Sequence, residues 1–212
     1  MANFLLVYDP DGARRQSAAL LARSRVAFLP HLQGELLLAP HYAVTWAAAA
    51  SAPIELHRSP QPGSADCLLF GEPYNDAGHA ITATDLSARH SLLWDVPGHG
   101  SGYYAALLIH PHRGVRVEAD VLGVFPLYYW QRGEVLLVAS SPELFRAHPL
   151  FKREVDLHGV AALLLTSGLV GGRTLWQGVR RLAPDHRCGH DRRGDGRAAG
   201  PPAGVRGPRG PA

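Results

Sequence analysis

The residues of this chain that could act as nucleophiles, bases or metal ligands form no catalytic set by type and spacing alone. Cys67 and Cys188 are the only cysteines, too few and too widely spaced for a disulfide framework or a zinc site. The twelve histidines are scattered without a metal-binding spacing on a predicted helix, so no metal site is predicted. The glycine-rich stretch 167–174 resembles a phosphate loop but lacks its lysine, and a helix C-cap followed by a turn explains it better.

The composition is that of an ordinary globular protein, large enough for one sizeable domain. The chain has 212 residues, of which 46% are hydrophobic and 18% charged. Its net charge of +3 comes from the C-terminal stretch, because six arginines and two acidic residues follow His186, which leaves 15 basic and 16 acidic residues before them. The near-neutral body predicts no nucleic-acid partner.

The sequence also lacks the marks of membrane insertion or export. No apolar run reaches the roughly 18–20 residues that cross a bilayer. The first apolar run, 4–8, has no basic region before it and ends at Asp9-Pro10, which is unlike a signal peptide. We therefore expect no membrane partner and a cytoplasmic location.

For the elements that must position any site, the sequence predicts a mixture of helices and antiparallel strands. The sequence predicts two hairpins, 103–109 with 115–118 and 126–130 with 134–139. It predicts helices at 14–25, at 85–94 with Thr84 or Asp85 as the N-cap, and at 156–166, where apolar residues recur at helical spacing. Further strands are expected at 4–8, near 26–29, 35–38 and 42–48, with 47–50 equally compatible with a helix, and at 68–70 before a turn at 71–75.

The stretch 187–212 is rich in Gly, Ala, Pro and Arg and predicts a disordered tail. Lys152 is the only lysine, as expected of a GC-rich gene. Two origins of the tail stay open: an out-of-frame translation of such a gene, which we favour, or a natural disordered segment.

One run of residues resembles the signature of a known family. Ala119-Asp120-Val121-Leu122-Gly123-Val124-Phe125-Pro126-Leu127-Tyr128-Tyr129 resembles the D-x-L-G-x-x-P-L-Y-Y signature in the N-terminal domain of asparagine synthetases. Further segments are similar to motifs of that family in the same order: 69–75, 82–85, 100–105, 138–143 and 172–186. The resemblance implies an α+β fold, a four-layer αββα sandwich of two antiparallel sheets between helices, as in N-terminal-nucleophile hydrolases. It assigns residues 1–186 to a class II glutamine amidotransferase-like domain.

The resemblance also says which residues would hydrolyse glutamine, and two of them are replaced. The family's nucleophile is a cysteine directly after the initiator Met, where this chain has Ala2. The family's oxyanion-hole asparagine corresponds to Phe70, although Gly71 keeps its position and could offer a backbone N–H. Cys67 lies mid-chain without a free amine and does not substitute for the nucleophile. We therefore assign no catalytic residue.

Parts of the substrate pocket are retained. Asp85 matches the family's aspartate for the substrate amine, and Glu72 lies in the binding turn, so Gly71, Glu72 and Asp85 are vestigial substrate-binding candidates. A helix N-cap would alone explain Asp85. Arg58 is the nearest, and a poor, counterpart of the arginine that holds the substrate carboxylate.

Three functions stay open. The preferred one is a non-catalytic domain of an asparagine synthetase-type amide ligase, as in β-lactam synthetases and lasso-peptide cyclases. The second is a fragment of a glutamine-hydrolysing asparagine synthetase, and the third is a stand-alone scaffold or binding domain. The resemblance implies a synthetase domain as partner, as a following domain or a separate chain, and glutamine as a candidate ligand. It assigns ATP and Mg²⁺ to that synthetase domain and no cofactor to this chain.

Overall fold

The computed structural model describes residues 2–60, 63–92, 100–166, 168, 171–183 and 187–191. Their elements in chain order are β1 (Asn3–Tyr8), α1 (Gly12–Val26), β2 (Gln33–Leu38), β3 (Ala43–Ala48), β4 (Ile54–His57), β5 (Asp66–Tyr74), α2 (Ala83–Leu92), β6 (Ser101–His110), β7 (Gly114–Ala119), β8 (Tyr128–Arg132), β9 (Val135–Ala139), the 3₁₀ helix η1 (Pro142–Ala147), α3 (Leu157–Thr166), β10 (Val179–Arg181) and β11 (Arg187–Asp191).

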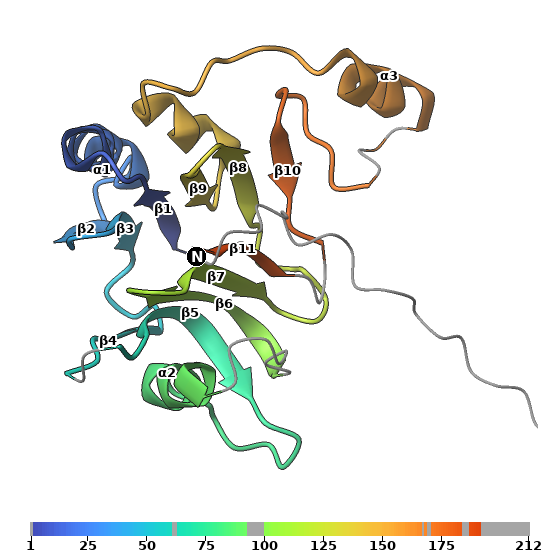
Figure 1. The fold of residues 1–212 in the computed structure, drawn as a ribbon. Coiled ribbons are helices and arrows are strands. Elements are labelled where there is room, and N and C mark those ends of the chain that lie inside the picture. Colours follow the sequence, from blue (N-terminus) through green and yellow to red (C-terminus); the bar gives the residue numbers. More distant parts are fainter. Residues whose placement is uncertain are drawn as a thin grey trace, which may run out of the picture.

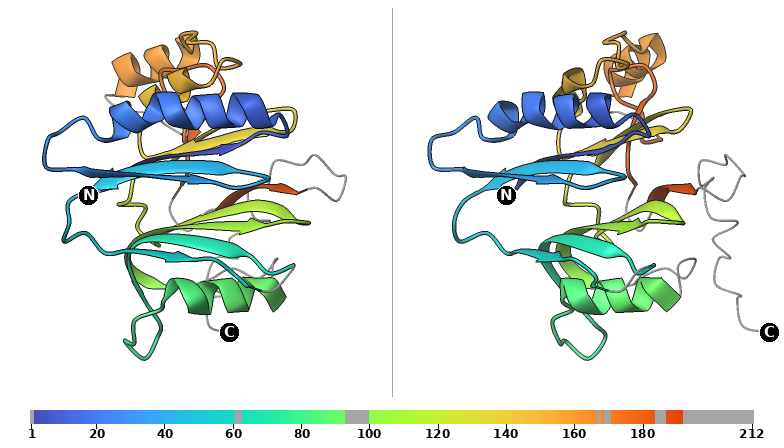
Figure 2. Two further views of the ribbon diagram at one scale, coloured as in Figure 1. Left: turned by 90° about the vertical axis from the view of Figure 1, so that its left-hand side faces the viewer. Right: turned by 60° about the vertical axis from the view of Figure 1, so that its left-hand side comes forward.

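These strands form two sheets in which every described pairing is antiparallel. The first sheet has the order β10-β8-β9-β1-β3-β2 and the second the order β11-β7-β6-β5-β4. Both hairpins predicted from the sequence are present, as β6–β7 and β8–β9. The sheets lie face to face, with α1 on the outer side of the first and α2 on the outer side of the second (Figure 2). The predicted αββα sandwich is therefore confirmed.

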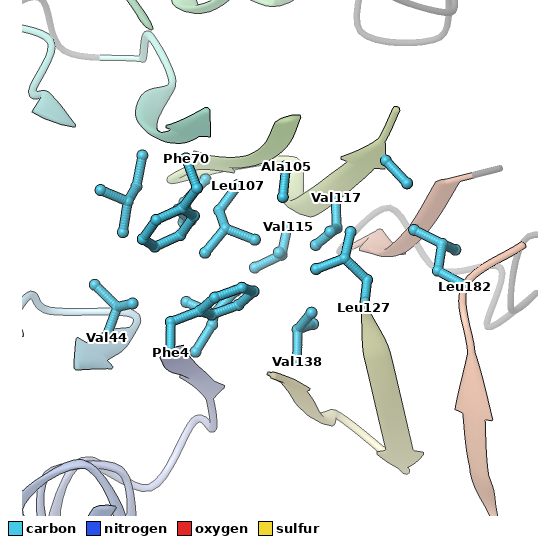
Figure 3. Close-up of a cluster of buried hydrophobic side chains, with 14 of the residues drawn as sticks. Phe4, Val44, Phe70, Ala105, Leu107, Val115, Val117, Leu127, Val138 and Leu182 are labelled. Atoms are coloured by element: carbon cyan, nitrogen blue, oxygen red, sulfur yellow. The ribbon is translucent and has the colours of Figure 1, made fainter. Parts of the chain in front are cut away.

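The layer between the sheets is the largest apolar cluster of the molecule. Inward-facing side chains of β1, β3 and β9 meet those of β5, β6 and β7 there (Figure 3). Phe4, Leu107 and Leu136 are completely buried in it. Two further clusters attach the outer helices: one holds α1 and η1 to the first sheet, and one holds α2 to the second. Alternation along the strands supplies both faces of each sheet, which explains why β1 is buried along almost its whole length.

The end of β1 is tied to two other elements by a buried charge. The Asp9 carboxylate is fully buried and accepts two hydrogen bonds from the Arg14 guanidinium, both at 2.9 Å. His148, directly after η1, lies with its Nε2 3.0 Å from the same carboxylate. The Leu150 N–H donates to the other ring nitrogen of His148, so Nε2 carries the proton and donates to Asp9. This network joins β1, α1 and η1 across 139 residues of sequence.

Several boundaries differ from the sequence prediction. No strand forms at 26–29, because α1 runs on to Val26 and its arginine-rich last turn precedes a loop. The turn expected at 71–75 is strand as far as Tyr74, since β5 stays paired with β6 to the register Tyr74 with Ser101. Residues 47–48 belong to β3. The predicted helix end at Trp94 lies outside the described residues.

Strand β11 corrects the domain boundary placed at His186. Residues 187–191 were assigned to a disordered tail, but they pair with β7 in the register Arg187 with Glu118 to Asp191 with Gly114. Backbone hydrogen bonds do not require apolar side chains, which is why a composition argument missed this strand. The part of the tail from Arg192 on lies outside the described residues.

Helix α3 forms where it is predicted, but its apolar spacing does not correspond to a buried stripe. Leu157, Leu164 and Leu165 are 76%, 79% and 84% exposed, and Gly159 is the buried residue of the helix. The helix projects beyond the two sheets (Figure 1), and contacts of Asp156 and Gly159 with residues 173–174 hold its N-terminal end. There, Asp156 caps it by accepting from the N–H groups of His158 and Gly159.

None of the helices in the described part of the chain combines the length and the apolar character that a membrane-spanning helix requires.

Candidate functional site

The position that the family resemblance gives to the nucleophile is a buried methyl group. Ala2 directly precedes β1, which lies between β3 and β9 in the first sheet. Its side chain is 5% exposed and belongs to the apolar layer between the sheets. A methyl group cannot attack a carbonyl or be activated by a base.

Phe70 belongs to the same apolar layer and takes part in an aromatic stack there. The Phe70 ring lies on the Phe4 ring of the opposite sheet, with centroids 4.7 Å apart and planes 13° from parallel (Figure 3). Phe125 packs against both rings at 6.2 and 6.3 Å. These contacts make Phe70 an inter-sheet packing residue. It offers no polar atom to an oxyanion.

Gly71 keeps the family's residue type, but its backbone donor is already used. Its N–H donates to the Pro53 carbonyl at 2.8 Å. Its φ is +91°, and a Cβ atom placed there would lie 2.0 Å from the Tyr103 carbonyl oxygen. The glycine is therefore required by the close approach of β5 and β6. The expectation that its N–H could be offered to an oxyanion is not met in this conformation.

Glu72 and Asp85 each have a partner within the protein. Glu72 is exposed and accepts from the Tyr74 hydroxyl at 2.7 Å, a hydrogen bond that raises the pKa of Tyr74. Asp85 accepts from both the hydroxyl and the N–H of Thr82 at 2.7 and 2.9 Å, while the Asp85 N–H lies 3.2 Å from the Thr82 hydroxyl. The hydrogen bonds from Thr82 lower the pKa of the Asp85 carboxyl.

The arrangement at Thr82 and Asp85 is a capping box at the start of α2. The N-cap predicted at Thr84 or Asp85 is wrong: Thr82 is the cap residue, and Asp85 is its reciprocal partner in the first turn. Helix capping alone accounts for the contacts of Asp85.

Cys67 and Arg58 lie away from this region. Burial raises the pKa of the Cys67 thiol, whose side chain is inaccessible beneath α2. A protonated, buried thiol is not a nucleophile. Arg58 lines a pocket with Tyr42 and Asp66, and that pocket contains none of Gly71, Glu72 and Asp85.

The signature run around Asp120 is a turn built on a buried carboxylate, while its side chains Val121, Leu122 and Val124 are exposed. The Asp120 carboxylate is fully buried and accepts from the N–H groups of Leu122, Val124 and Phe125 at 3.1, 3.0 and 2.8 Å. Gly123 completes the turn with φ +62°. The turn places Phe125 against Phe4 and Phe70, so the signature supports packing. No cluster of three or more metal-ligating side chains occurs in the described part of the chain.

The comparisons with known proteins support only the coarser part of the resemblance, the glutamine amidotransferase class. Residues 96–197 match the family model of the glutamine amidotransferase domain. Over this stretch, which is slightly less than half of its length, the chain is similar to a glutamine amidotransferase domain. The matched stretch contains the signature turn but none of Ala2, Phe70, Gly71, Glu72 and Asp85, so it does not test those residues.

One solved structure is similar to this chain at a low level. It is glutamine phosphoribosylpyrophosphate amidotransferase from B. subtilis, complexed with ADP and GMP, with 13% sequence identity and a TM-score of 0.45. The likeness covers 89% of this chain and 49% of that one, so this chain spans about half the length of that protein. A comparison with curated proteins gives no match.

Proposed function

We propose that this amidotransferase-like domain does not hydrolyse glutamine and serves as the N-terminal domain of an asparagine synthetase-type, ATP-dependent amide ligase. The family match and the signature turn support the domain class. The resemblance over 69–75, 82–85 and 172–186 supports the ligase context. ATP and Mg²⁺ would act in a synthetase partner that forms the amide.

The observation that carries this proposal is that each residue at a position expected to act in hydrolysis instead packs in the core or makes a backbone hydrogen bond of the fold. Hydrolysis requires an activated nucleophile and free donors aimed at the developing oxyanion. Ala2 supplies no nucleophile, Phe70 is stacked on Phe4, and the Gly71 N–H is bonded to Pro53. Loss of a single oxyanion donor typically lowers the rate by about 10²–10³, and here the nucleophile is replaced as well.

The alternative of a glutamine-hydrolysing fragment requires a thiol that reacts with glutamine. Treating the native protein with a glutamine-like diazo ketone, followed by mass spectrometry of its peptides, tests for one. We expect the native protein to form no adduct whose yield falls when excess glutamine is present. The same reagent should label Cys67 only in denaturant, where its burial is lost, and a Cys67→Ser variant is the matched control. A stoichiometric, glutamine-protected adduct on the native protein would overturn the proposal.

The ligase context has its own test. Translating the DNA that follows the gene in all three frames would reveal a synthetase body with the S-G-G-x-D-S pyrophosphate loop if the proposal holds. Neighbouring DNA without such a sequence, together with no complex between this chain and synthetase domains of the same genome, would favour a stand-alone scaffold.

A further inference from the structure

A pocket of about 340 Å³ opens at the opposite end of the inter-sheet layer from Ala2. The pairing of β1 and β3 fixes this separation: Asn3, beside Ala2, pairs with Ala47, whereas Val7 pairs with Ala43, beside Tyr42 of the pocket. Turns from both sheets line it, since it includes the β2–β3 and β6–β7 turns and the segment after β4. Its volume is in the range of small-molecule sites.

A hydrogen-bonded pair of a buried tyrosine and a half-buried carboxylate fixes one wall of this pocket. The Tyr42 side chain is almost completely buried, and its hydroxyl donates to Asp66 Oδ2 at 2.7 Å. The Ser59 N–H donates to Asp66 Oδ1 at 3.1 Å. Burial, and then the bond to Asp66, raise the pKa of Tyr42, so the phenol stays a donor. The carboxylate is thus held in one orientation before any ligand arrives.

A positive charge faces the same space without a partner. Arg58 lines the pocket, and in the described part of the chain its guanidinium makes no hydrogen bond or ion pair. Its charge lowers the pKa of Tyr42, although burial and Asp66 outweigh this effect, which places the guanidinium within electrostatic range of the phenol. Arg58 is exposed, so its planar group is free to bind a carboxylate in a bidentate manner.

Apolar groups form the remaining walls. Pro40, Ile109 and Pro111 line the pocket, and Ile109 is 4% exposed. Each oxygen of Asp66 accepts one bond from the protein and has a lone pair left for a second donor. The pocket therefore combines a free cation, a fixed anion that can still accept, and an apolar surface.

We propose that this pocket binds a small apolar α-amino acid, whose carboxylate pairs with Arg58, whose ammonium group donates to Asp66, and whose side chain packs against Ile109 and the prolines. The site is distinct from the hydrolytic positions around Ala2 and Phe70. It does not depend on the proposed ligase function.

Isothermal titration with L-leucine, L-valine, L-methionine and L-glutamine tests this site. Two leucine analogues dissect it: 4-methylpentanoate lacks the amine, and 3-methylbutylamine lacks the carboxylate. We expect saturable binding of at least one apolar amino acid, and at least about tenfold weaker binding of either analogue, because each loses one charge-assisted contact.

Variants locate the binding on the molecule. Arg58→Gln should weaken binding about tenfold or more, and Asp66→Asn should weaken it while retaining an acceptor for Tyr42. Arg132→Gln, an exposed arginine outside the pocket, is the matched control and should bind like the wild type. Binding that Arg58→Gln leaves unchanged, or no binding of any amino acid to the folded wild-type protein, would overturn the proposal. Because Arg58 is exposed, its replacement is not expected to unfold the chain, and circular dichroism of each variant verifies this.

Discussion

At Gly71 the backbone leaves no room for any other residue. Its φ of +91° is in the region that disfavours side chains, and the Tyr103 carbonyl oxygen occupies the place of a Cβ atom. The same conformation directs its N–H to Pro53. The glycine that the family resemblance assigns to an oxyanion hole is thus required here by the close approach of β5 and β6.

Gly71→Ala should therefore lower the free energy of unfolding by several kcal/mol, since strain and a backbone clash add. Gly78→Ala is the matched control, because Gly78 has φ +78° but nothing within 4 Å of its Cβ position. It should cost only the conformational term, about 1–2 kcal/mol. Urea unfolding of both variants checks this, and equal losses would show that the close approach at Gly71 does not exist.

At Asp9 and at His148, burial and the charged or hydrogen-bonding partners shift the pKa in opposite directions. Burial disfavours the Asp9 carboxylate, but hydrogen bonds from Arg14, the Asp11 N–H and His148 outweigh it and hold the pKa of Asp9 below its usual value. Burial lowers the pKa of His148 and outweighs the opposite effect of Asp9. The imidazole therefore stays neutral in the folded protein to lower pH than in the unfolded chain.

This difference predicts that acid weakens the fold. Between the lowered folded pKa of His148 and its unfolded value near 6.5, the unfolded chain binds more protons, so the stabilisation is complete above about pH 6.5 and is lost as pH falls through the folded value. The slope from this group is at most about 1.4 kcal/mol per pH unit. His148→Gln should flatten the dependence measured by urea unfolding between about pH 5 and 7. His158→Gln, at an 86% exposed side chain, should leave it unchanged. Identical slopes in wild type and His148→Gln would contradict the buried pair.

At the scale of elements, the start of α2 depends on two side chains that bond each other's backbone. Thr82 and Asp85 satisfy one another's N–H groups in the way that a capping box requires. This geometry assigns Asp85 to helix initiation. A substrate-binding role would need its carboxylate to exchange these partners for a ligand.

A double-mutant cycle measures the coupling at this cap. Thr82→Ala should lower stability by about 1 kcal/mol, and Asp85→Ala by a similar amount. The double variant should cost about as much as either single variant, because each one already breaks the box. Chemical unfolding of the four proteins gives the coupling energy, and strictly additive losses would show that the two residues act independently.

The elements that the sequence predicted best are those set by local pattern. The two hairpins follow from apolar runs around Gly114 and Gly133, and α1 follows from its helix-forming residues. Helix α3 was predicted in place, but periodicity could not show that Leu164 and Leu165 would face solvent, since that depends on what packs against the helix. Strand β11 could not be recognised because residues 187–191 have neither an apolar run nor alternating apolar residues, whereas their pairing with β7 is made by the backbone.

At the scale of the whole molecule, the sandwich came from the family resemblance, because no local pattern states how two sheets face each other. The replacement at Ala2 and Phe70 was visible in the sequence. The stack on Phe70 and the pair of Asp9 and His148 could not be predicted, because they join residues far apart in the sequence. Phe4 and Phe70 are 66 positions apart, and Asp9 and His148 are 139 apart. The pocket at Arg58 was missed for the same reason, since it is assembled from three separate loops.

The proposal on which the others depend is that this chain does not hydrolyse glutamine. The most direct measurement is the release of glutamate and ammonia from glutamine by the purified protein, compared with buffer and with the Cys67→Ser variant. We predict that all three give the same rate. Saturable glutamine hydrolysis by the wild-type protein, well above the buffer rate, would show that the proposal is wrong.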